Sequence, residues 1–391
     1  MATTARYRDA VTESVNPKPP HPPATPPPAL DPAPWSHYLT LREIEAAGAE
    51  PMPAGPRAYY EGAAADEVTL RDNQAAFERW RIVPRMMVPN DQRDQSVEVL
   101  GRRWPTPVAI APRALQRLAH PEGELAVARA AAARGMTYLL STCASANFEE
   151  VRGTGVDTWF QLYLLSQRSR SKDLLDQAEA SGCEAVVLTV DTPMTGLRER
   201  DIRHGYKLPP GILYALIRRS SAERGASSLD DQVQSSYSWD DVEWTIANTK
   251  LPVLVKGVLH ADDAKRCVGM GAAGVIVSNH GGRQQDVAIA ALDAVPACAD
   301  AIGSDGIVLM DGGSRRGTDV LTALALGARA VLVGRPVLFA LPLGGEAAVG
   351  YTLDLLRNEI DRGLALSGIP RADQWDRGSI VRAGSVPGLV P

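Results

Sequence analysis

From residue 107 onward, short apolar runs alternate with longer alanine-rich stretches of helical period. Eight apolar runs end in glycine or polar residues, as buried parallel strands do. These predicted strands are Val108–Ala111, Tyr138–Ser141, Trp159–Leu162, Val186–Val190, Val253–Lys256, Val275–Ser278, Ile307–Met310 and Ala330–Val333. The helices predicted between them include Glu122–Arg134, Ser171–Ser181, Ala261–Met270 and Thr318–Leu326.

Eight strand-then-helix units predict an α/β fold, a (β/α)8 TIM barrel. An open, doubly wound parallel sheet is the alternative. The barrel is favoured because the strand count is eight. Polar residues also follow many strands, whereas a doubly wound fold concentrates them at one glycine-rich turn.

The chain before the barrel divides into an arm and a helical segment. Residues 1–34 are dense in proline between Pro17 and Pro34, which predicts a disordered or extended arm. A polyproline II ligand for a partner protein is the alternative. Helices are predicted at Trp35–Ala47, Arg57–Ala65 and Thr69–Trp80. Residues 35–391 are predicted to form one barrel domain.

One connection is much longer than the rest. About sixty residues separate the fourth predicted strand from the fifth, and the segment 205–237 is rich in glycine, serine and arginine. A loop of this length in a compact domain is usually a lid or is disordered. We therefore predict a lid insertion after strand four.

Composition excludes several classes of partner. The net charge of -5 offers no basic surface for nucleic acid. The four cysteines are scattered, with no C-x-x-C pair, which indicates a reducing, cytoplasmic location. No apolar run approaches the roughly 18 to 20 residues that cross a bilayer, so no membrane association is expected. No cluster of carboxylates or cysteines resembles a metal site.

The segment Val275–Asp286, VIVSNHGGRQQD, places chemistry directly after a predicted strand. His280 is a candidate base and Arg283 a fixed cation. In a barrel, catalytic residues gather at the carboxyl ends of the strands. A turn with a solvated histidine and arginine is the alternative.

Two glycine-arginine loops follow strands seven and eight: DGGSRRG at Asp311–Gly317 and VGRP at Val333–Pro336. In this fold those loops commonly bind phosphate, because glycines expose backbone N–H groups and Arg315 and Arg335 add charge. We expect a phosphate-bearing cofactor or substrate here. Glycines that serve only the turns, with surface arginines, are the alternative.

Other strand ends carry polar residues that would share the same mouth: Lys256, Asp191, Arg198, Gln161 and Tyr163. Two arginines suit a carboxylate, which they can bind bidentately. A histidine near an aspartate suits a general base. Together they indicate removal of a proton or hydride from a carbon beside a carboxylate.

These residues resemble the FMN-dependent 2-hydroxy acid oxidase and dehydrogenase family, which includes glycolate, lactate and mandelate oxidases. The resemblance runs from about Tyr59 to about Leu366. Its motifs are IAPRALQRLAHPEGE, FQLY, LTVDTP, LVKGV, VSNHGGRQ, DGGSRRGTDV, ALGA and VGRP. The resemblance implies that the barrel binds FMN and oxidises an (S)-2-hydroxy acid to the 2-oxo acid.

The resemblance also implies roles for single residues. His280 matches the family's essential base and Asp191 the aspartate that orients it. Arg198 and Arg283 match the carboxylate clamp, and Tyr59 and Tyr163 the tyrosines that bind substrate oxygens. Lys256 matches the lysine near flavin N1 and O2. The remaining cofactor contacts that we expect are Pro112, Arg113, Ala114, Ser141, Gln161, Thr189, Ser278, Asp311, Gly312, Gly313, Ser314, Arg315, Gly334 and Arg335.

Two departures from the family pattern concern the substrate. Arg113 stands where relatives carry a small residue beside the flavin, and Cys143 stands where glycolate oxidases carry tryptophan. We therefore expect a substrate bulkier than glycolate, either aromatic and mandelate-like or carrying an extra polar group. The Pro-rich arm is a third departure.

The expected electron acceptor is O2, because Ala114 is the residue that oxidases tend to have where some dehydrogenases have glycine. A dehydrogenase or a decarboxylating monooxygenase of the same family is the alternative. A flavin-dependent isomerase would not need two carboxylate-binding arginines, and a non-catalytic partner protein would not need His280. Relatives are often tetramers, which implies a homo-oligomer.

Overall fold

The computed structural model describes residues 33–89, 91–205, 207–217 and 233–385. Eight strands form a closed barrel in the order β10-β11-β4-β5-β6-β7-β8-β9. They are β4 (Val108–Ile110), β5 (Tyr138–Ser141), β6 (Thr158–Leu162), β7 (Val186–Thr189), β8 (Val253–Val258), β9 (Gly274–Val277), β10 (Ile307–Asp311) and β11 (Ala330–Val333). The predicted (β/α)8 barrel is confirmed.

The last barrel strand pairs with the first, and this pairing closes the sheet. Val331 of β11 lies opposite Val108 of β4, and all neighbouring barrel strands run parallel. Strands β5, β6 and β7 are buried along their whole length because side chains fill the interior and helices cover the outside. The open-sheet alternative is wrong, because β11 pairs with β4 and closes the sheet.

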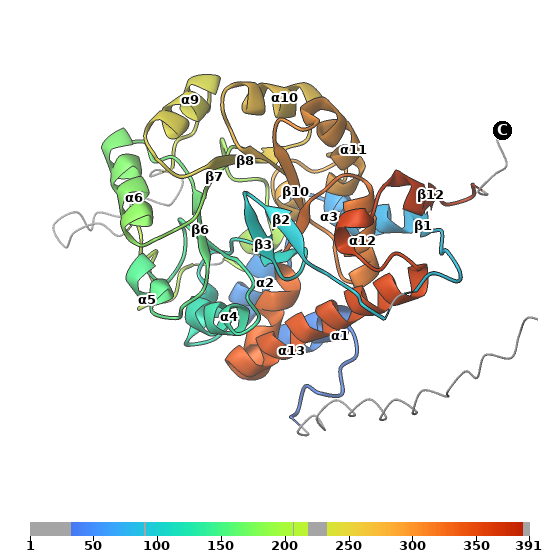
Figure 1. Cartoon of the computed structure of the whole chain (residues 1–391). Coiled ribbons are helices and arrows are strands. Elements are labelled where there is room, and N and C mark those ends of the chain that lie inside the picture. Colours follow the sequence, from blue (N-terminus) through green and yellow to red (C-terminus); the bar gives the residue numbers. More distant parts are fainter. Residues whose placement is uncertain (1–32, 90, 206, 218–232, 386–391) are drawn as a thin grey trace, which may run out of the picture.

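A ring of helices surrounds the barrel (Figure 1). It includes α4 (Gly123–Ala132), α5 (Phe148–Arg152), α6 (Arg168–Ala180), α9 (Trp239–Ala247), α10 (Ala261–Gly269), α11 (Ala291–Ile302), α12 (Gly317–Ala325) and α13 (Arg335–Ser367). A further short helix, α7 (Glu199–Arg203), follows β7. Each helix predicted between barrel strands is present, with its ends shifted by a few residues.

The N-terminal segment forms α1 (Leu41–Ala49), α2 (Ala54–Glu61) and α3 (Val68–Ala75). The prediction of a helix from Trp35 was wrong at its start, because Thr40 caps α1 and forms a capping box with Glu43. The prediction for Thr69–Trp80 was wrong at its end. There α3 passes into a 3-10 turn at Ala76–Arg79 and then into strand β1 (Trp80–Ile82).

Two antiparallel pairs outside the barrel were not predicted. β1 pairs with β12 (Ile380–Arg382) and so ties the N-terminal segment to the C-terminal one. β2 (Val97–Val99) pairs with β3 (Arg102–Trp104). Each of these strands has three residues, too few for a periodic pattern to be recognised.

Helix α13 packs against α1, α4 and α12, and Gly344 and Gly345 interrupt its helical backbone. By length and hydropathy it is the one described helix that could span a bilayer, so the statement that no segment is long and apolar enough was wrong here. Its most apolar window is 67% buried inside the protein. Packing against neighbouring helices accounts for that apolar composition.

The predicted arm and lid lie partly outside the described residues, which begin at 33 and omit 206 and 218–232. The described flanks of the lid segment pack on neighbouring barrel loops. Ala215 N–H donates to Ala144 O at 2.8 Å, and Gln234 N–H donates to Leu164 O at 2.8 Å. Both flanks therefore lie beside the loops that follow β5 and β6.

Candidate active site

A cavity of about 350 Å³ lies where the carboxyl ends of the barrel strands meet. Every residue predicted for the site lines it, except Asp191 and Ser278. These two lie behind the wall, where they line a second cavity and contact His280 and Lys256. The predicted residues are therefore brought together in one place.

The backbone at His280 is held in an unusual conformation. His280 has φ 59°, in the left-handed region that non-glycine residues rarely adopt. Its N–H donates to Ser278 Oγ at 3.0 Å, and the Asn279 side chain accepts from Gly282 N–H at 3.2 Å. This short turn after β9 turns the imidazole into the cavity. Strained residues of this kind cluster at functional sites.

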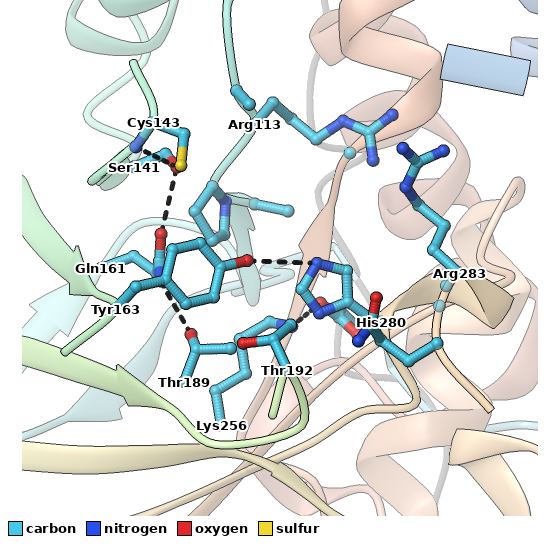
Figure 2. Close-up of a pocket in the computed structure, with 18 of the residues that line it drawn as sticks. Arg113, Ser141, Cys143, Gln161, Tyr163, Thr189, Thr192, Lys256, His280 and Arg283 are labelled. Atoms are coloured by element: carbon cyan, nitrogen blue, oxygen red, sulfur yellow. Dashed lines mark hydrogen bonds and ion pairs between the residues drawn. The ribbon is translucent and has the colours of Figure 1, made fainter. Parts of the chain in front are cut away.

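The two imidazole nitrogens of His280 have different partners. Nδ1 lies 2.9 Å from Asp191 Oδ1. Nε2 lies 3.3 Å from the Tyr163 hydroxyl, a contact drawn in Figure 2. An ionised carboxylate only accepts hydrogen bonds, so Nδ1 carries the proton and Nε2 keeps its lone pair. The arrangement presents a basic nitrogen to the cavity.

Burial and nearby charges set the protonation of these groups. Burial lowers the pKa of His280, although the Asp191 carboxylate acts in the opposite direction. Burial alone would raise the pKa of Asp191, but His280 and Lys256 bring it below its ordinary value. Burial holds the pKa of Tyr163 well above its ordinary value, so its hydroxyl keeps the proton. At neutral pH a neutral imidazole therefore faces a hydroxyl and is backed by a carboxylate.

Room for Asp191 is provided by a glycine in β8. Gly257 has φ 103°, and a Cβ built there would lie 2.6 Å from Asp191 Cβ. The register of β8 against β9 also shifts between Lys256 and Val258. A larger residue at this irregularity would displace the carboxylate that contacts His280.

The two predicted clamp arginines lie on the cavity wall. Arg283 Nη1 donates to Tyr59 O at 2.6 Å and to Gly62 O at 2.7 Å, and its guanidinium lies 5.0 Å from the centre of the Tyr59 ring. Burial lowers the pKa of Arg283 to about 9, which leaves it protonated at neutral pH. Arg198 Nη2 donates to Gln284 Oε1 at 2.9 Å.

Gln284 was not predicted as a site residue. Its amide also donates to Asp191 O at 3.0 Å and to Met194 O at 2.8 Å, so it fixes Arg198 relative to the loop after β7. The available signal was its position directly after Arg283 in the VSNHGGRQ motif.

A row of polar side chains crosses the ends of consecutive strands β5 to β9. Gln161 accepts from Ser141 Oγ at 3.1 Å and donates to Thr189 Oγ1 at 3.0 Å. Lys256, which is 3% exposed, donates from Nζ to Ser278 Oγ at 2.9 Å. Its Nζ also lies 3.3 Å from Asp311 Oδ2. This row offers donors, acceptors and one positive charge to a flat polar ring.

The loop after β10 forms the other end of the cavity. Gly312 and Gly313 have φ of 98° and 89°, and a Cβ at Gly313 would lie 2.0 Å from Asn73 O. Asp311 Oδ1, Ser314 Oγ and Arg113 Nη2 are buried without a hydrogen-bond partner in the described part of the chain. Buried polar atoms of this kind require partners. An FMN ribityl chain and phosphate supply hydroxyls and anionic oxygens, so these residues fit the cofactor.

Cys143 lines the cavity and is 2% exposed, so a small side chain occupies this part of the cavity wall.

Among the described residues, no group of three or more histidine, cysteine or acidic side chains is placed to hold a metal.

Comparison with known proteins identifies relatives along most of the chain. The family model described as FMN-dependent dehydrogenase matches residues 49–382. The chain is 44% identical over 332 residues to an L-lactate oxidase of Nostoc sp., covering 81% of this chain and 91% of that protein. It is 42% identical over 338 residues to a 4-hydroxymandelate oxidase of Amycolatopsis orientalis, covering 85% and 95%.

A solved structure has the same fold at comparable identity. It is that of a mandelate oxidase with (S)-2-phenylpropionate, with a TM-score of 0.82 and 40% identity. The match covers 88% of this chain and 98% of that one.

Proposed function

The chain belongs to the FMN-dependent dehydrogenase family, in the group of 2-hydroxy acid oxidases, and we propose that it oxidises an (S)-2-hydroxy acid to the 2-oxo acid with O2 as electron acceptor. The observation that carries the proposal is the His280 imidazole, which contacts Asp191 through Nδ1 and lies in one cavity with Arg198 and Arg283. A base beside a pair of guanidiniums suits a substrate in which the reacting carbon adjoins a carboxylate.

The proposed mechanism assigns one task to each group. Arg198 and Arg283 bind the substrate carboxylate, and the Tyr163 hydroxyl donates to a substrate oxygen. Oxidation of CH–OH to C=O releases two electrons and two protons, and Nε2 of His280 accepts one proton. The Asp191 carboxylate stabilises the imidazolium that results. FMN, when bound, would accept the two electrons and the second proton.

Lys256 acts at the cofactor end of the reaction. Its buried ammonium lies on the cavity wall at the end of β8, between Ser278 and Asp311. A fixed positive charge in a site with little water stabilises negative charge that develops on a bound cofactor. This agrees with the role that the family resemblance assigns to Lys256.

We further propose a substrate bulkier than glycolate. Cys143 supports this, because it places a small side chain on the wall next to Tyr163. Two relatives are named as a 4-hydroxymandelate oxidase and a mandelate oxidase, names that refer to aromatic 2-hydroxy acids. An aromatic 2-hydroxy acid is therefore the substrate class that we favour.

We also propose that the protein is cytoplasmic and forms a homo-oligomer. All four cysteines are buried and none forms a disulfide, which supports the cytoplasmic location. A homo-oligomer, with the tetramer as the expected form, is proposed by analogy with the family. Light scattering of the purified protein measures the assembly directly.

The test of the function starts from the purified protein with FMN bound. Each of glycolate, lactate, mandelate and a 2-hydroxydicarboxylate is added without oxygen, and bleaching of the flavin absorbance is followed. Air is then admitted, and the organic product is identified. We expect bleaching by mandelate, rapid return of colour in air, and the 2-oxo acid as product. Absence of bleaching by every 2-hydroxy acid would overturn the proposal, and a decarboxylated product would identify a monooxygenase.

A further inference from the structure

Arg113 is a charged side chain in the cavity, and one of its buried donors has no hydrogen-bond partner among the described residues. It follows Pro112 after β4, and that donor is its Nη2. A guanidinium stays protonated in proteins, and a buried charged donor without an acceptor is destabilising. The position therefore calls for a negatively charged group that binds in the cavity.

The stem of Arg113 runs past the loop after β11. A Cβ built at Gly334 would lie 3.4 Å from Arg113 Cδ and 3.7 Å from its Nε. Gly334 precedes the first turn of α13, which has no side-chain cap. Uncapped N–H groups at a helix start favour anions. Arg113 thus lies beside one of the two loops from which we predicted phosphate binding.

The other two arginines at this end already have partners. Arg335 donates from Nε, Nη1 and Nη2 to the backbone oxygens of Tyr60, Gly281 and Gly62, at 3.0 to 3.1 Å. Arg315 donates from Nε and Nη2 to the Glu45 carboxylate at 2.6 and 2.8 Å. These contacts fix both guanidiniums in place and leave only part of their donors for a ligand. Of these three arginines, Arg113 is the one with a buried nitrogen, Nη2, that has no hydrogen-bond partner among the described residues.

Local charge favours a dianion. Glu45 interacts with Arg113, Arg315 and Arg335, so one carboxylate faces three guanidiniums. Asp311 is also near Arg113, but it pairs with Lys256. Guanidiniums thus outnumber carboxylates at this end, even with Asp319 near Arg315. A phosphate monoester carries nearly two negative charges at neutral pH, whereas a carboxylate carries one.

We propose that Arg113 binds the phosphate group of the flavin cofactor, as a third guanidinium beside Arg315 and Arg335. Figure 2 shows the Arg113 side chain extending across the cavity toward Arg283, so a second carboxylate of a substrate is the competing anion. The phosphate is favoured because Arg198 and Arg283 already supply two guanidiniums for a substrate. The inference rests on the FMN dependence of the family and is independent of the substrate proposed above.

The test compares FMN with riboflavin, which lacks the phosphate. Apoprotein is prepared from wild type, Arg113→Thr, Arg113→Lys and a control, Arg103→Thr. Each is titrated with both flavins, and quenching of flavin fluorescence gives Kd. Arg103 pairs with Asp94 at the surface, and its side chain is 74% exposed. The control therefore removes a guanidinium far from the cavity.

We expect Arg113→Thr to weaken FMN binding on the order of 10- to 100-fold, the range for a hydrogen bond to a charged group. Riboflavin affinity should stay unchanged, and Arg113→Lys should lie between wild type and Arg113→Thr. Arg103→Thr should match wild type for both flavins. Circular dichroism of each apoprotein establishes that the variants are folded.

Two results would overturn the assignment. An equal loss of FMN and riboflavin affinity would place Arg113 against the ring or ribityl chain, or give it a structural role. Unchanged FMN affinity, together with a fall in kcat/KM confined to 2-hydroxydicarboxylates, would assign Arg113 to the substrate. Flavin binding is measured without turnover. A failure of the proposed oxidation would therefore leave this test intact.

Discussion

The His280 imidazole donates its Nδ1–H to the Asp191 carboxylate at 2.9 Å, and this contact decides which nitrogen faces the cavity. The two residues are 89 positions apart in the chain and follow different strands, β9 and β7. The closed barrel brings these strand ends together, and Gly257 leaves space for the carboxylate. The orientation of the proposed base therefore depends on the barrel and on the local turn after β9.

Replacing His280 with alanine should leave FMN bound but slow anaerobic reduction of the flavin by at least about 10²-fold, the scale of general-base catalysis. The variant removes the only nitrogen that the Asp191 contact directs into the cavity. Stopped-flow absorbance measures the rate. His260→Ala is the control, because His260 is a surface residue with 71% of its side chain exposed. Near-normal reduction in His280→Ala would refute the assignment of the base.

The pH profile of kcat/KM should have an acid limb below pH 6.5. Burial lowers the pKa of His280 from its ordinary 6.5, so the imidazole stays neutral and basic down to that pH. Below it, protonation removes the base, and kcat/KM falls as pH falls. Steady-state rates between about pH 4.5 and 8.5 cover the ordinary histidine range. An acid limb centred above pH 7 would show that Asp191 raises the pKa of His280 by more than burial lowers it.

Asp191→Asn should lower kcat and move the acid limb to still lower pH. The Asp191 charge raises the pKa of His280, so its removal lowers that pKa further. The amide can also hold the imidazole in the wrong tautomer, with Nε2 protonated and unable to act as a base. The same pH series on this variant gives both effects. An acid limb that moves upward would contradict the proposed electrostatic role.

Arg283→Lys should reduce kcat/KM on the order of 10- to 100-fold and raise KM, because a compact ammonium cannot replace a planar fork. Arg283 uses Nη1 on two backbone oxygens and stacks on Tyr59, which aims its remaining donors. Arg81→Lys is a matched control. Arg81 also donates from Nη1 to two backbone oxygens, at 2.7 Å each, but on the surface. If Arg283→Lys and Arg81→Lys have the same kcat/KM and KM, Arg283 does not bind the substrate carboxylate.

The barrel was predictable because the strand signal is repeated eight times, and because polar residues at strand ends must meet once the barrel closes. Glu45 was not predictable. It lies 270 residues from Arg315, and nothing in α1 distinguishes it from other surface acids. The β1–β12 pair was not predicted either, because its two strands are far apart in the sequence and their register depends on the tertiary fold. Sequence patterns therefore located the strand ends that line the cavity and missed the contact of Arg315 with Glu45 in the N-terminal segment.

Cys143→Trp should change the substrate preference from bulky to small 2-hydroxy acids. Cys143 is 2% exposed on the cavity wall and interacts with Tyr163, so an indole at this position would extend into the space beside the proposed base. Loss of one well-packed group in a hydrophobic pocket changes discrimination by roughly 10- to 200-fold. We therefore expect kcat/KM for mandelate to fall by about that range, while glycolate is much less affected.

The measurement is kcat/KM for glycolate, lactate and mandelate in wild type, Cys143→Trp and Cys143→Ala. Cys143→Ala changes the same wall without adding volume, so its ranking of substrates should match wild type. An added side chain in a packed region can destabilise the protein. A thermal melt of each variant therefore shows whether a lower kcat/KM comes from unfolding or from poorer substrate binding. If wild type prefers glycolate, and tryptophan leaves the ranking unchanged, then Cys143 does not set the size of the pocket. In that case the space beside Tyr163 is filled by another side chain, and the substrate class must be sought among small acids.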